Sequence, residues 1–141
     1  MVRRDGAAAL VRVHAVRGSA PRDVGACMAV RPDGAFHGTI GGGSLEWEAL
    51  ADARAALADG RGPARFRDYA LGPDLGQCCG GRAVIGVETF DARDEEALAT
   101  LAAAERNGTF AVECALDIDG RVMRAILSSE KGAEEGQEIK R

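Results

Sequence analysis

The chain has 141 residues, of which 46% are hydrophobic and 28% charged, and its formal net charge is -4. This length suits one hydrophobic core and is too short for two ordinary domains. The negative balance argues against general affinity for nucleic acid or anionic membranes, so any phosphate site must be local. No apolar run reaches the roughly 20 residues that span a bilayer, and no signal peptide precedes the first strand, so we expect a cytoplasmic protein.

The first half of the chain predicts three strands and a helix. Apolar patterns indicate strands over residues 10–16, 26–30 and 35–40, and Arg31-Pro32-Asp33-Gly34 predicts the turn between the last two. Residues 44–59 have helical spacing, with Ser44 as the expected N-cap and Asp59-Gly60 as the end. Trp47, the one tryptophan, is expected to pack in the interior.

The second half predicts two strands, a helix and a hairpin. The strands are expected over 66–71 and 83–90, the helix over 94–106, and the hairpin strands over 110–116 and 121–127. The helix should cover the sheet through Leu98, Leu101 and Ala102. We therefore predict an α+β fold, a mixed β-sheet packed with two helices in two or three layers and ending in a β-hairpin. Residues 1–128 are expected to form one domain, and residues 129–141 a charged, disordered tail or the start of a linker.

The glycine-rich turn before the first long helix is one candidate anion site. Gly41, Gly42, Gly43 and Ser44 lead from a strand into a helix N-terminus, where free N–H groups and the helix dipole attract phosphate. The pattern matches neither the P-loop nor the dinucleotide fingerprint. That these glycines only form a tight turn is an equally open interpretation. Glu46 is interpreted as a residue that complements the helix dipole, and Glu48 lies on another helix face.

Two further loops carry chemically useful side chains. The loop between the first two strands holds Ser19 and Arg22, which suit phosphate or the edge of a pterin-like ring, although a solvated surface arginine is the more common outcome. A later loop holds Gln77, Cys78 and Cys79 between glycines, where a thiolate can carry sulfur or bind a soft metal. Adjacent cysteines lack the spacing of structural zinc sites.

The remaining cysteines and the histidines are given structural interpretations. Cys27 and Cys114 fall in apolar strand-like runs, so they are expected to pack in the core as reduced thiols. His14 and His37 are isolated on strand-like segments. A Cys-His pair formed only in space is a minor alternative for them.

Taken together, three motifs resemble the N-terminal domain of the XdhC/CoxI family of xanthine dehydrogenase accessory proteins. They are Gly18-Ser19-Ala20-Pro21-Arg22 with Gly25-Ala26, Gly38-Thr39-Ile40-Gly41-Gly42-Gly43 with Leu45-Glu46, and Leu71-Gly72-Pro73 with Leu75-Gly76-Gln77-Cys78-Cys79-Gly80-Gly81. The match covers residues 10–88, with the motifs in the family's order. Longer family members carry a second, Rossmann-like domain after this one.

The resemblance implies a chaperone for the molybdenum cofactor (molybdopterin), held as cargo, sulfurated with a cysteine desulfurase as sulfur source and delivered to a molybdenum hydroxylase such as xanthine dehydrogenase. Gly41, Gly42, Gly43 and Ser44 would then hold the phosphate, Ser19 and Arg22 would contact phosphate or pterin, and Gln77, Cys78 and Cys79 would complete the site, with both thiols facing molybdenum or incoming sulfur. Such a protein has no catalytic residue of its own. A homodimer is left open.

Two alternatives come from other functional classes. A redox or sulfur-transfer enzyme would use Cys78 or Cys79 with turnover, and would show a low thiol pKa. A nucleotide-phosphate-binding module would bind simple nucleotides and would tolerate the loss of both thiols.

Overall fold

The computed structural model describes residues 1–20, 22–72, 80–108 and 111–127. Its centre is a five-stranded sheet in the order β3-β2-β1-β5-β4, and each neighbouring pair of strands is antiparallel. The strands are β1 (Ala7–Arg17), β2 (Cys27–Val30), β3 (Phe36–Gly38), β4 (Arg65–Ala70) and β5 (Arg82–Asp91). The predicted α+β class is confirmed. The sheet was expected to mix parallel and antiparallel strands, whereas all its neighbouring strands are antiparallel.

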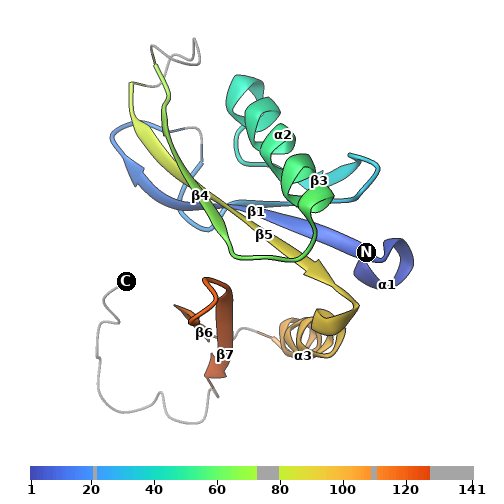
Figure 1. Ribbon diagram of the computed structural model, residues 1–141. Coiled ribbons are helices and arrows are strands. Elements are labelled where there is room, and N and C mark those ends of the chain that lie inside the picture. The colour runs from blue at the N-terminus through green and yellow to red at the C-terminus, as the bar shows by residue number, and fades with distance from the viewer. Residues whose placement is uncertain (21, 73–79, 109–110, 128–141) are drawn as a thin grey trace, which may run out of the picture.

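Helices and a separate hairpin lie on both sides of this sheet (Figure 1). The helical elements are α1 (Val2–Asp5), α2 (Gly43–Asp59), the short 3-10 turn η1 (Ala92–Asp94) and α3 (Glu95–Arg106). The hairpin consists of β6 (Ala111–Leu116) and β7 (Val122–Leu127). The first residues, expected to lead directly into a strand, form α1 instead. None of the helices in the described ranges is long and apolar enough to cross a membrane.

One face of the sheet, which we call the α2 face, holds the main hydrophobic core. Alternate residues of β1 point to this face, so Val11 and Val13 are almost fully buried. Ala49, Ala53 and Ala56 of α2 recur at helical spacing, and their small side chains let the helix approach the sheet closely. This cluster also contains Met28, Val30, Ile40, Leu45, Tyr69, Leu71, Ala83, Ile85 and Val87.

The opposite face, which we call the α3 face, is covered less completely. Helix α3 buries no residue, although Leu98, Leu101 and Ala102 were expected to pack against the sheet. Leu98 packs only on the edge of a small cluster formed by Val2, Ala8 and Phe90. Helical periodicity shows which side of α3 is apolar, but it does not show how closely the helix approaches the sheet. The prediction therefore overestimated the burial of these side chains.

Polar contacts attach the β6–β7 hairpin to the rest of the fold. Arg124 pairs with Glu88 of β5 through both guanidinium NH₂ groups, and both side chains are largely buried. Arg121 donates to the carbonyl oxygens of Gly62 and Thr89, at 2.6 and 3.0 Å. Hydrogen bonds and an ion pair therefore hold the hairpin over the α3 face, and apolar packing contributes little.

Candidate functional site

The three loops singled out in the sequence leave the same end of the sheet. In an antiparallel sheet, neighbouring strands run in opposite directions, so β1, β3 and β4 end where β2 and β5 begin. The β1–β2 loop, the β3–α2 turn and the described ends of the β4–β5 loop therefore all lie at this end, which we call the loop end. The topology brings together segments that are up to about 60 residues apart in the chain.

The β1–β2 loop and the base of the β4–β5 loop touch backbone to backbone. A Cβ added at Gly81 would overlap the carbonyl oxygens of Arg17 and Ser19, so only glycine allows this approach. The Leu71 N–H donates to the Gly81 carbonyl at 2.9 Å and closes the base of the loop. Ser19 thus lies directly beside Gly81. The predicted site residues Gln77, Cys78 and Cys79 fall outside the described residues.

Arginines give the loop end a local positive charge. Arg17, the last residue of β1, lies directly opposite Arg82, the first residue of β5. Arg82 pairs with Asp68 at 3.2 Å, whereas Arg17 and the exposed Arg22 make no ion pair with any residue that the structure describes. Asp68 already offsets the charge of Arg82, so Arg17 and Arg22 are the guanidinium groups at this end that have no ion-pair partner among the described residues. The site can therefore accept an anion even though the whole chain is acidic.

Helix α2, which follows the glycine turn, begins earlier than predicted. Helix α2 begins at Gly43, so Gly42 is the N-cap, and Ser44 lies within the first helical turn with its side chain exposed. The expectation that Ser44 is the N-cap was wrong. Gly41, Gly42 and Gly43 have φ values of 124°, 73° and 63°, a region that side chains other than glycine rarely adopt. The backbone conformation therefore requires the three glycines.

The carboxylate of Glu46 organises this turn from inside. It accepts hydrogen bonds from the Thr39 hydroxyl at 2.7 Å and from the N–H groups of Gly42 and Ile40 at 2.9 and 3.2 Å. Partial burial opposes ionisation of Glu46, but these hydrogen bonds outweigh it and lower the pKa of the carboxyl group. Sequence reasoning missed this role, although a Thr and a Glu on either side of three glycines were the available signal.

The bonds inside the turn determine which N–H groups remain for a ligand. Gly42 donates to Glu46, and Gly41 donates to the Thr39 hydroxyl oxygen at 3.0 Å. Among the described residues, no acceptor is found for the N–H groups of Gly43 and Ser44, which open α2. An anion at this turn would therefore be held by the start of the helix, on the side away from the Glu46 carboxylate.

Two cysteines and the tryptophan are placed differently from the prediction. Cys27 and Cys114 are exposed, because Cys27 begins β2 on the incompletely covered α3 face and Cys114 lies on the outlying hairpin. Trp47 is 78% exposed, since Leu45 and Ala49 are the residues of this turn that point to the core. Apolar character along the chain does not show which side of an element faces the sheet.

The histidines form no ion pair within the described ranges, and Glu46 and Glu48 have separate partners. His14 packs edge-on against Phe66 with the ring centroids 5.1 Å apart, and burial lowers its pKa. His37 is exposed on β3. Glu48 lies 3.4 Å from Arg67, away from the partners of Glu46, as their different helix faces predicted. In the described part of the chain, no three His, Cys, Asp or Glu side chains are grouped to hold a metal ion.

Comparisons with known proteins agree with the motif pattern. Residues 1–69 match the model of the XdhC and CoxI family. A crystal structure from Bacillus halodurans, described as a xanthine dehydrogenase, is similar with a TM-score of 0.72 and 24% sequence identity over 91% of this chain. The chain spans 40% of the length of that protein, and the likeness shows a shared fold. No curated protein matches the chain.

Proposed function

Because residues 1–69 match the model of the XdhC and CoxI family, we propose that this chain is an accessory protein for the maturation of xanthine dehydrogenase or a related molybdenum hydroxylase. In this role it holds the molybdenum cofactor as cargo, supports its sulfuration and passes it on. It acts by binding and delivery, without turnover of a free substrate. The partners are the hydroxylase and a cysteine desulfurase that supplies sulfur.

The observation that supports this proposal is that the first two family motifs and the described ends of the third, Leu71 and Gly81, lie at the loop end of one sheet. A cofactor with a phosphate, a pterin ring and a metal centre needs several kinds of contact within one site. The exposed Arg22 and Ser19 supply a guanidinium and a hydroxyl, and the start of α2 supplies the N–H groups of Gly43 and Ser44. Cys78 and Cys79 are proposed to face the molybdenum or the incoming sulfur.

The charge pattern supports the same assignment. Arg22 on the β1–β2 loop is exposed and makes no ion pair with any residue that the structure describes, so its guanidinium group can bind a phosphate at the loop end. Glu46 already occupies the inner side of the glycine turn. The phosphate is therefore proposed to lie over Gly43 and Ser44, with Gly41 and Gly42 shaping the turn rather than donating to the ligand.

The test is an anaerobic titration of the protein with the molybdenum cofactor, with ATP in a parallel titration. Arg22→Gln should weaken cofactor binding by about tenfold or more, because a charge-assisted hydrogen bond is lost. Arg54→Gln is the matched control, since Arg54 is also exposed but lies beside Gly34 at the opposite end of the sheet. A Cys78→Ala/Cys79→Ala double variant should also bind more weakly.

Three results would contradict the proposal. Absence of cofactor binding to the folded protein would remove it, as would equal losses in Arg22→Gln and Arg54→Gln. Binding of ATP in place of the cofactor, insensitive to loss of both thiols, would assign a phosphate-binding module instead.

A further inference from the structure

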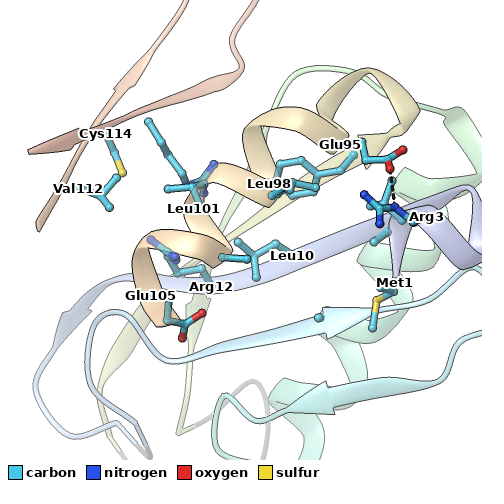
Figure 2. Close-up of a pocket in the computed structure, with 17 residues that line it drawn as sticks. Met1, Arg3, Leu10, Arg12, Glu95, Leu98, Leu101, Glu105, Val112 and Cys114 are labelled. Carbon is cyan, nitrogen blue, oxygen red and sulfur yellow. Dashed lines mark hydrogen bonds and ion pairs between the residues drawn. The ribbon is translucent and has the colours of Figure 1, made fainter. Parts of the chain in front are cut away.

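A cavity of about 660 Å³ lies between the α3 face of the sheet, helix α3 and the β6–β7 hairpin. Figure 2 shows Leu10 and Arg12 of β1 together with Leu98 and Leu101 of α3 and with Val112 and Cys114 of the hairpin. A volume of several hundred Å³ is typical of sites for small molecules. The cavity extends from the middle of β1 toward Met1, Ala8 and Phe90, away from the loop end.

The walls of this cavity are mainly apolar. Helix α3 presents Leu98, Leu101 and Ala102 to the cavity but buries none of them, whereas α2 buries four residues on the other face. Apolar side chains around an unfilled volume lose the contacts that packed interiors provide. An apolar molecule in the cavity would supply those contacts without any change in the sheet.

One positive charge in the cavity lacks a partner. Arg3 pairs with Glu95 at 2.6 Å, and Arg124 pairs with Glu88 through two hydrogen bonds. Arg12 makes no ion pair within the described ranges, and its Nε atom is buried without a hydrogen-bond acceptor there. A buried donor without an acceptor is unfavourable, and a carboxylate is the group that best satisfies a guanidinium.

The other charges restrict the ligand to a single negative charge. Glu105 also lines the cavity, and Glu95 stands at its side near Arg3 (Figure 2). These carboxylates would repel a second negative charge, as in a phosphate monoester. The ligand class that fits is therefore a carboxylate on an apolar body, which differs from the phosphate-bearing cargo proposed for the loop end.

We propose that this cavity is a binding site for an amphipathic monocarboxylate, with its carboxylate on Arg12 and its apolar body against Leu98 and Leu101. The site is separate from the loop end and does not depend on the proposed function. Cys114 provides a built-in reporter, because its exposed thiol lies on the cavity wall and a bound molecule would cover it.

The test is calorimetric titration of the full chain with decanoate, with the uncharged 1-decanol as the matched probe. We expect saturable binding of one decanoate per chain and about tenfold or weaker binding of 1-decanol, because the charged contact is absent. Arg12→Gln should weaken decanoate binding to a similar extent. Ala102→Phe should abolish binding of both probes by filling the cavity, and Arg106→Gln, an exposed arginine on the same helix outside the cavity, should bind decanoate as the native chain does.

A second readout does not depend on any variant. Alkylation of each cysteine by iodoacetamide, followed by mass spectrometry, should slow at Cys114 when decanoate is present and stay constant at Cys27, which is exposed outside the cavity. The proposal is overturned if decanoate shows no saturable binding, if several molecules bind each chain, or if 1-decanol binds equally well. It is also overturned if Ala102→Phe leaves decanoate affinity unchanged or if Cys114 is not protected.

Discussion

The two faces of the sheet differ in how far the side chains of the covering helix are buried: α2 buries four residues and α3 buries none. Helix α2 closes one contiguous core in which Val11, Met28 and Ala49 have no exposed surface. On the other face, polar contacts attach the hairpin, α3 buries no residue, and a cavity remains between these elements and the sheet. The α2 face therefore supplies most of the packing that holds the loop end in place, while the α3 face keeps a cavity lined by incompletely buried side chains.

The largest expected effect on the free energy of unfolding comes from truncating one leucine in each covering helix, Leu45 in α2 and Leu101 in α3. Leu45→Ala, at a side chain 1% exposed in the main core, should lower the free energy of unfolding by about 4 kcal/mol. Leu101→Ala, on the cavity wall of α3, should cost no more than about 1 kcal/mol, since its side chain already has incomplete contacts. Urea unfolding measures both, and equal losses would mean that α3 is packed as firmly as α2.

The next effect concerns the ion pair that attaches the hairpin. Arg124→Met should lower the free energy of unfolding by about 3 kcal/mol, because it leaves the Glu88 carboxylate buried without its partner. The double variant Arg124→Met/Glu88→Gln should recover much of this loss, because no buried charge remains. Thermal unfolding followed by circular dichroism gives the comparison. A loss in Arg124→Met no greater than in Arg3→Met, at an exposed pair, would show that the Glu88 contact does not hold the hairpin.

A smaller effect should separate two neighbouring glutamates of α2. Glu46→Ala should cost about 2 kcal/mol, because it removes the acceptor for the Thr39 hydroxyl and two backbone N–H groups. Glu48→Ala, which removes an exposed contact to Arg67, should cost less than about 1 kcal/mol. Because hydrogen bonding lowers the pKa of Glu46, its contribution should be present near neutral pH and disappear as the pH falls below about 4.5. Denaturation midpoints of the native chain and of Glu46→Ala, measured between pH 7 and pH 3, provide the test. If the difference between them does not change with pH, Glu46 does not have this role.

The smallest effect is the pH dependence contributed by the α3 face. Burial, followed by the nearby Arg12, lowers the pKa of His14 below its ordinary value of 6.5, with Arg124 acting in the same direction and Glu88 opposing. The unfolded chain therefore binds the proton more readily, so stability should fall as the pH drops through about 6.5. His14→Gln should flatten this part of the stability curve, and removal of the exposed His37 by His37→Gln should not. An unchanged slope in His14→Gln would refute the assignment.

The sequence by itself determined the order and type of the seven strands and the two long helices, but not the short α1 and η1. Alternating apolar residues identified every strand of the sheet, and helical spacing with glycine boundaries identified α2 and α3 to within one or two residues. Two of the three glycine-containing motifs lie within residues 1–69, the part of the chain that matches the XdhC and CoxI family model, and their residue types and order are local properties of the chain. Local patterns succeed here because backbone conformation depends on neighbouring residues.

Only the tertiary structure decided what those elements cover. The exposure of Cys27, Cys114 and Trp47 depends on how completely each face of the sheet is covered, which no local pattern records. The same is true of the Glu46 carboxylate inside the glycine turn and of the cavity beside Arg12. The antiparallel order of the strands brings three distant loops to one end, because it joins residues that share no sequence neighbourhood.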